Sequence, residues 1–260
     1  MTVVGWQKPF RGTQLNRTHP LARGLKVCIL LNELDGDIVY DYARNKILTI
    51  NSTADWEGNT LNLATTSDYI ILGDHDELYP DGIMTITTKA RVIANANAWL
   101  FADSADDYQG GARRYYANDI LRLYGKASNS TSANTIDEYN ISEISDLDNL
   151  HIYTIEYGGS SGSRLYVDGA LNGAITNGPH YMCNPANLLL GCSIHAPNSK
   201  FDFFMLWNRK LSPEEVALLH REPYCMFQPT FDIGAFEYVE SGGGLSIPVA
   251  MHHYNQLRSA

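Results

Sequence analysis

Residues 201–224 read FDFFMLWNRKLSPEEVALLHREPY, an aromatic and apolar run that is followed at once by a helix start. The run over residues 201–207 is typical of a β-strand, because aromatic side chains pack well on a pleated surface. The segment after it predicts a single short helix from Pro213 to about His220, and Pro223 ends that helix. The question that this stretch raises is what one short helix covers in a chain that is otherwise rich in strand-like sequence.

The start of this helix carries several independent signals. Ser212 can cap the helix, Pro213 suits its first position, and Glu215 completes a capping box with Ser212. Leu211 and Val216 have the spacing of a hydrophobic staple. The apolar residues Val216, Leu218 and Leu219 are expected to pin the helix against the edge of a β-sandwich.

Short strand-like segments bounded by Gly, Asn, Asp or Pro recur along the chain. They lie at residues 25–31, 68–73, 83–93, 151–158, 164–169 and 187–194. Asp168-Gly169 stands between two apolar runs and predicts a β-hairpin, because this pair tolerates the positive φ angles of a tight turn. Many short strands with almost no helical periodicity predict an all-β fold, an antiparallel two-sheet β-sandwich with one short C-terminal helix.

The composition divides the chain into three parts. Residues 1–24 hold several Pro and Gly with no sustained periodicity and are interpreted as an extended basic arm. Residues 25–238 are interpreted as one β-sandwich domain, since sandwiches often run to this size. Residues 239–260 are interpreted as a C-terminal tail joined through the flexible SGGG at 241–244.

The net charge of −10 argues against nucleic acid as a partner, because a polyanion is repelled by an acidic surface. The charge is segregated, however. Residues 1–32 carry five cations and no carboxylate, so a basic end of +5 is attached to a body of −15. No long apolar run or signal-peptide pattern is present, so we expect no membrane partner and folding in a cytoplasm.

Several segments resemble laminin-G-like domains of the concanavalin A-like lectin/glucanase superfamily. They are TTSDYIILGDHDEL (65–78), IMTITTKARV (83–92), RLYVDGALNG (164–173), NLLLGCSI (187–194) and the stretch at 201–224. The resemblance covers residues 25–227 and implies a concanavalin A-like jelly roll. One departure is that the family commonly has Phe-x-Gly-x-Ile-Asp before its final strand, whereas here no Gly is present and Asp202 stands earlier.

The segment LNRTHPLARGLKVCILLNE at 15–33 is similar to the opening of laminin-G-like proteins found in the virions of tailed phages. This resemblance implies a non-catalytic virion structural protein, made in the host cytoplasm, that serves as a head decoration or a fibre component. We expect it to attach to other virion proteins through the N-terminal arm and the C-terminal tail and to form a homo-oligomer, with host glycans as a further class of ligand.

Two other functions stay open. One is a carbohydrate-binding adhesin outside a capsid. The other is a glycoside hydrolase, which would need carboxylates two residues apart on one strand so that they face the same cleft. The nearest approach to that pattern is EISDLD at 143–148, which reads as a polar turn, so we expect no enzyme activity.

Calcium is the only cofactor that the sequence suggests. Asp68, Asp74 and Asp76 are the best candidate ligands, because calcium prefers oxygen and related lectin domains bind it through Asp at a sheet rim. A second acidic cluster lies at residues 103–107. Solvated acidic loops are the alternative interpretation for both clusters.

A sugar site would need aromatic platforms with polar partners on loops. Tyr108, Arg113, Tyr115 and Asn118 meet this requirement in a segment that reads as rich in loops. Tyrosine is abundant in this chain, at 16 of 260 residues, so strand and core packing is the alternative interpretation.

Overall fold

The computed structural model describes residues 7–51, 55–65, 67–80, 82–92, 98–103, 110–115, 119–126, 134–144, 146–147, 149–158, 162–175, 187–191 and 199–227. The chain divides into two compact units, Met1–Gln228 and Pro229–Ala260, and all of the described residues lie in the first. The predicted tail at 239–260 therefore falls outside them. Among the described residues, no helix is long and apolar enough to cross a bilayer.

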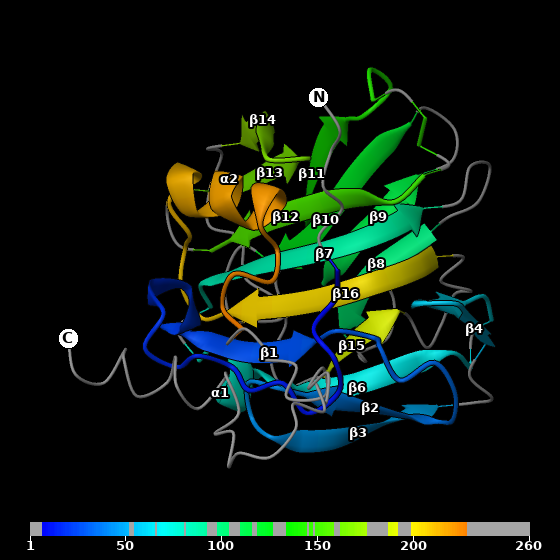
Figure 1. Ribbon diagram of the computed structural model, residues 1–260. Helices are drawn as coiled ribbons and strands as arrows, with labels where there is room; N and C mark the ends of the chain where they lie inside the picture. The colour runs from blue at the N-terminus through cyan, green and yellow to red at the C-terminus, as the bar shows by residue number, and fades with distance from the viewer. Residues whose placement is uncertain are drawn as a thin grey trace, which may run out of the picture. The chain divides into compact units, whose positions relative to one another are not determined.

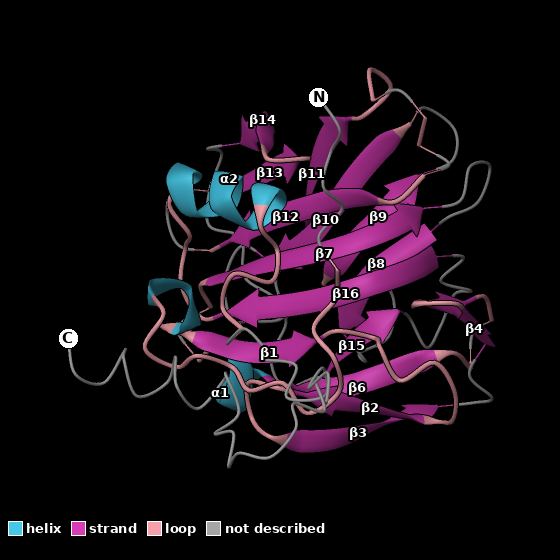
Figure 2. Ribbon diagram, viewed as in Figure 1, coloured by secondary structure: helices cyan, strands magenta, loops and turns pink. Residues whose placement is uncertain are grey.

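Antiparallel strands dominate the domain, as Figures 1 and 2 show. The strands are β1 (Leu25–Ile29), β2 (Ile38–Asp41), β3 (Lys46–Asn51), β4 (Asp55–Glu57), β5 (Thr60–Leu63), β6 (Tyr69–Asp74), β7 (Met84–Val92), β8 (Ala98–Asp103), β9 (Gly111–Tyr115), β10 (Ile120–Lys126), β11 (Asn134–Asn140), β12 (His151–Tyr157), β13 (Ser163–Val167), β14 (Ala170–Ile175), β15 (Asn187–Gly191) and β16 (Ser199–Trp207). Helices are α1 (His75–Leu78) and α2 (Pro213–Arg221), with a 3-10 turn at Pro20–Ala22. The all-β prediction is confirmed, and α2 is the expected short helix.

The two-sheet arrangement of the predicted sandwich is not confirmed. Hydrogen bonding follows one continuous path, β11-β10-β9-β8-β15-β6-β3-β2-β1-β16-β7-β12-β13-β14, with β5 on β16 and β4 on β5. Strand β3 makes the connection, because its first residues pair with β2 while Ile50 and Asn51 pair with β6. The result is barrel-like rather than two separate sheets.

The predicted hairpin forms between β13 and β14. Asp168 has φ 49° and Gly169 has φ 80°, the positive values that a tight turn requires. Gly169 also lies close to α2, since a Cβ atom at this position would stand 2.8 Å from the Cβ of His220. Gly169 is therefore needed for two reasons: the turn requires its positive φ, and α2 packs too closely for a side chain at this position.

Strand β16 is buried on both faces and forms the centre of the domain (Figure 1). One face places Phe201, Phe204 and Leu206 in the main core between the strands. The other places Phe203, Met205 and Trp207 in a second core with α2, the 3-10 turn and β1. The helix therefore covers the outer face of an apolar strand that would otherwise be exposed to water.

The predicted capping of α2 is present. The hydroxyl of Ser212 accepts the N–H of Glu215 at 3.2 Å, and the carboxylate of Glu215 accepts the N–H of Ser212 at 2.8 Å. Arg209 binds the same carboxylate through two nitrogens, which lowers the pKa of Glu215. Leu211 and Val216 are both buried in the second core, as a hydrophobic staple requires.

Replacing Leu219 by Ala should destabilise the domain by roughly 2 to 5 kcal/mol, because this side chain is 1 % exposed and its loss leaves a cavity under α2. Ser212→Ala, which removes one capping bond and an exposed hydrogen bond to Glu214, should cost about 1 kcal/mol. Denaturant unfolding of both variants measures the two values. A neutral Leu219→Ala variant would mean that α2 does not contribute to the stability of the second core.

An ionic contact closes the end of the β12–β13 pair. His151 Nδ1 lies 2.7 Å from a carboxylate oxygen of Asp168, and its Nε2 lies 3.0 Å from the backbone oxygen of Asp146. Both neighbours are acceptors, so the ring satisfies them fully only as a doubly protonated donor. Partial burial lowers the pKa of His151, but the hydrogen bonds to Asp168 and Asp146 outweigh it and the net shift is upward.

A raised folded-state pKa means that this contact contributes fully below the ordinary histidine value of about 6.5 and is lost as the pH rises through the folded-state value. The destabilisation caused by His151→Gln should therefore be larger at about pH 5.5 than at about pH 8.5. Urea unfolding at both values tests this expectation. In an Asp168→Asn background the pH dependence of the effect should disappear, and its persistence there would assign it to other groups.

Candidate binding site

The structure brings two of the four predicted sugar-binding residues together. Arg113 and Tyr115 lie on β9, whereas Tyr108 and Asn118 fall outside the described residues. The guanidinium carbon of Arg113 is 5.3 Å from the ring centre of Trp99, 5.5 Å from that of Tyr115 and 5.2 Å from that of Tyr124. Arg113 is 4 % exposed, so its charge is held within a cluster of aromatic rings.

The segment around Arg113 is not the loop that the sequence suggests. It forms β9, which pairs with β8 and β10, and Tyr124 lies on β10. A loop was expected because one face of these strands carries Arg and Tyr, which hides the usual alternation of apolar and polar residues. Arg122 extends this face with a guanidinium 3.9 Å from the ring centre of Tyr115 and a 2.7 Å ion pair to Glu138.

The three candidate calcium ligands each have a defined place. Asp68 accepts the N–H groups of Ala64 and Thr65 at 2.9 and 2.6 Å, and Asp74 accepts the N–H of Glu77 at 2.9 Å where α1 begins. Asp76 lies in the first turn of α1, while Asp68 and Asp74 stand at opposite ends of β6. Within the described ranges, no group of three or more His, Cys, Asp or Glu side chains is placed to hold a metal, and calcium binding stays a prediction.

The described part of the N-terminal arm packs against the same domain. The ammonium of Lys8 pairs with the carboxylate of Asp202 and also donates to the carbonyls of Leu31 at 3.2 Å and Asp202 at 2.7 Å. Asp202 sits at an irregularity in the pairing of β16 with β7 and binds Lys89 at 2.6 Å as well. Asp202, the residue at which this sequence departs from the family pattern, thus binds the arm to the domain through Lys8.

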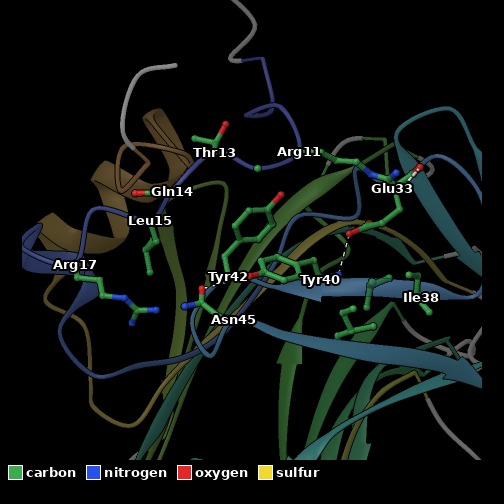
Figure 3. Close-up of a pocket in the computed structure, with 13 residues that line it drawn as sticks. Arg11, Thr13, Gln14, Leu15, Arg17, Glu33, Ile38, Tyr40, Tyr42 and Asn45 are labelled. Carbon is green, nitrogen blue, oxygen red and sulfur yellow. Dashed lines mark hydrogen bonds between the residues drawn. The ribbon is translucent and has the colours of Figure 1, made fainter. Parts of the chain in front are cut away.

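A cleft of about 780 Å³ lies where the arm passes the β2–β3 hairpin. We call it the arm cleft; its lining consists of arm residues from Arg11 to Arg17, of Glu33, and of side chains of the hairpin. In Figure 3 the rings of Tyr40 and Tyr42 stand between Arg11 and Glu33 on one side and Arg17 and Asn45 on the other. Its size is within the usual range for small-molecule sites, about 300 to 1,000 Å³.

Local hydrogen bonding positions the two rings. A carboxylate oxygen of the buried Asp41 accepts the N–H groups of Cys28 and Ala43, both at 2.9 Å, which determines the turn after β2. Tyr40 and Tyr42 then meet edge to face with their ring centres 4.9 Å apart. Rings held in this way are a preformed platform with polar groups at both ends.

The arm side of the cleft is held by contacts with the residues that follow α2. The N–H of Asn16 donates to the carbonyl of Met226 at 2.8 Å, and Leu15 forms an isolated antiparallel bridge with Phe227. Phe227 in turn packs edge to face on Tyr42 with the ring centres 5.3 Å apart. Arg11 donates to the carbonyl of Glu33 at 2.6 Å, which closes the opposite end.

Two polar atoms that line the arm cleft have no hydrogen-bond partner within the described residues. They are Thr13 Oγ1 and Glu33 Oε2, and both residues are only 6 % exposed. The other carboxylate oxygen of Glu33 accepts the N–H of Tyr40 at 2.9 Å. Burial raises the pKa of Glu33 despite that hydrogen bond, and burial also raises the pKa of Tyr42.

Sequence reasoning did not identify this site. The one local signal was Tyr40 and Tyr42 two residues apart, the spacing that places side chains on one face of a strand. Nothing in the sequence linked them to Thr13 or Glu33, since the arm was expected to attach to other virion proteins. The described arm residues instead complete the cleft.

A protein-family model described as the concanavalin A-like lectin/glucanases superfamily matches residues 64–217 of this chain. The matched span begins before β6 and ends within α2. A search of curated protein sequences finds no match. These comparisons do not address a tailed-phage origin, which stays a prediction.

Several solved structures share the fold at low sequence identity. The binding domain of Paraclostridial Mosquitocidal Protein 1 has TM-score 0.60 and 14 % identity, with 77 % of this chain and 52 % of that chain covered. The receptor binding domain of botulinum neurotoxin C/D mosaic serotype has TM-score 0.58 and 11 % identity, covering 76 % and 51 %. Trypanosoma rangeli sialidase in complex with sialic acid has TM-score 0.53 and 15 % identity, covering 78 % and 34 %. The chain therefore spans about half or less of each of these proteins.

Proposed function

Because this chain belongs to the concanavalin A-like lectin/glucanases superfamily, we propose that it is a non-catalytic saccharide-binding protein and that the arm cleft is its binding site. Saccharide sites combine aromatic faces, which pack against sugar C–H groups, with a few polar groups that hold hydroxyls in place. The arm cleft offers the half-buried ring of Tyr40, which packs against the buried Tyr42, for the first role, and Thr13, Glu33 and Asn45 for the second.

The observation that carries this proposal is the pair of buried polar atoms without partners, Thr13 Oγ1 and Glu33 Oε2. A buried polar atom that lacks a hydrogen bond costs about 1 to 3 kcal/mol, so a ligand that supplies the missing bond recovers part of that cost when it binds. Two of them line the same cleft. Hydroxyl groups of a bound sugar can satisfy both, since a hydroxyl donates and accepts.

The fold neighbours support a binding role. One is the binding domain of a mosquitocidal protein and another is the receptor binding domain of a botulinum neurotoxin, so ligand recognition is a use to which this fold is put. The sialidase shares the fold as well, so catalysis is the alternative that an assay must address. Turnover of a polysaccharide by the purified chain would refute the non-catalytic part of the proposal.

Tyr40→Ala should weaken saccharide binding at least about tenfold, equivalent to about 1.4 kcal/mol, because the half-buried ring forms the floor of the arm cleft. A glycan array followed by calorimetry on the strongest ligand measures the effect. Tyr69→Ala is the matched control, since Tyr69 is also half-buried but lies on β6 outside the cleft. Equal affinity of the wild type and Tyr40→Ala would place the binding site elsewhere.

Thr13→Val should separate stability from binding. The substitution keeps the shape of the side chain but removes a buried hydroxyl that has no partner among the described residues, so the ligand-free domain should melt at the same temperature or higher. Saccharide binding should weaken at the same time, because the ligand loses a hydrogen bond. A lower melting temperature without ligand would show that Thr13 Oγ1 already has a structural partner.

We also propose that the chain serves as a virion component, as a head decoration or fibre subunit. The proposal is supported by the similarity of residues 15–33 to proteins of tailed phages and by the composition of residues 239–260. Lys8, Arg11 and Arg17 hydrogen-bond within the domain, so we assign attachment mainly to the tail. Its apolar residues follow a Gly-rich linker and are too few for an independent core.

Deletion of residues 241–260 should leave a folded, saccharide-binding domain that no longer incorporates into particles, because apolar burial by the tail is lost. Particle incorporation is measured by co-sedimentation with assembled virions, and folding by the melting temperature. The full chain is the reference. Incorporation of the truncated chain at the level of the full chain would assign attachment to the domain itself.

A further inference from the structure

The charges around the arm cleft are opposite in sign to those of the protein as a whole. Three charged residues line the cleft, Arg11, Arg17 and Glu33. The chain carries a net charge of −10, which on average repels anions from its surface. Two guanidinium groups beside one buried carboxyl group therefore make this cleft a locally positive place on an acidic protein.

Arg17 is held in place and keeps donors for a ligand. Its Nη2 donates to the carbonyl of Ala43 at 3.0 Å, and this is the only hydrogen bond that its guanidinium makes within the described residues. The side chain is exposed and lies beside Asn45 (Figure 3). A guanidinium oriented in this way can bind a carboxylate through two parallel N–H groups.

The opposite end of the cleft has different chemistry. One oxygen of Glu33 already accepts the N–H of Tyr40, and the other oxygen is buried without a partner among the described residues. Arg11 lies at this end as well, but it already donates to the carbonyl of Glu33 and its charge is offset by the Glu33 carboxylate, whereas a sugar hydroxyl can either donate to Glu33 or accept from it. The cleft therefore fits a ligand that places an anionic group beside Arg17 and hydroxyl groups beside Glu33.

We infer that the arm cleft selects saccharides that carry a carboxylate, with the acid group bound by Arg17 and ring hydroxyls bound by Glu33 and Thr13. This inference rests on the proposed saccharide binding and adds the class of sugar. Tyr40 and Tyr42 lie between the two ends, where the body of the sugar would pack. A neutral sugar would leave the donors of Arg17 unused, while an anion without hydroxyls would leave Glu33 Oε2 without a partner.

The test compares matched acidic and neutral ligands by calorimetry on the full chain. The probes are a glucuronic acid disaccharide against its carboxyl-reduced form, and sialyllactose against lactose. In at least one pair the acidic sugar should bind at least about tenfold more tightly. This advantage should shrink as NaCl rises from about 0.05 M to about 0.5 M, because salt screens the exposed cation.

Variants of Arg17 test whether this residue causes the preference for acidic sugars. Arg17→Gln should remove the preference, so that the acidic sugar binds no more tightly than its neutral partner, and Arg17→Lys should restore part of the preference, because charge returns without the bidentate geometry. Arg23→Gln is the control, since Arg23 is an exposed cation of the arm outside the cleft. A melting temperature for each variant confirms that it is folded.

The outcomes distinguish the two proposals. If acidic and neutral sugars bind equally and Tyr40→Ala abolishes both, the saccharide function stands and acid selectivity is wrong. If an acid preference persists in Arg17→Gln, the carboxylate is bound elsewhere and the role of Arg17 is overturned. If no saccharide binds, the proposed function fails and this inference fails with it.

Discussion

Burial of β16 on both faces is the constraint on which the rest of the domain depends. One face belongs to the core between the strands, but Phe203, Met205 and Trp207 would expose a large apolar area if nothing lay over the other face. Helix α2, the 3-10 turn at Pro20–Ala22 and residues 226–227 provide that cover. The indole N–H of Trp207 donates to the carbonyl of Leu21 at 2.6 Å, so the polar atom of the largest side chain on this face is satisfied too.

Covering β16 brings the arm into the domain and thereby creates the arm cleft. Once Leu21 is buried in the second core, the chain before it must cross the outer side of β1 and β2, where Asn16 and Leu15 bond to residues 226 and 227. Lys8 then binds Asp202 at the far end. The segment in between passes the β2–β3 hairpin without filling the space above its two tyrosines, and that space is the candidate binding site.

Sequence reasoning worked where the signal and its effect lie within a few residues of each other. Ser212 and Glu215 are three residues apart, and Asp168-Gly169 is a dipeptide, so the cap and the turn form for reasons visible in the sequence. It worked less well on β9 and β10, because Arg113 takes a position on the strand face that an apolar residue usually holds. Three surrounding rings stabilise that charge. Two of them lie on β8 and β10, and a local sequence pattern does not show that these strands are neighbours of β9.

The sequence by itself determined the all-β class, the short capped helix, the hairpin and the likeness to laminin-G-like domains, since periodicity, turn chemistry and motif spacing are local properties. Only the tertiary structure decided that β3 joins the strands into one continuous path and that the arm returns to its own domain. Lys8 reaches Asp202 across 194 residues of sequence. Contacts of this kind form because the folded chain must cover β16 and satisfy a buried ion pair, and those requirements exist only after the distant segments have met.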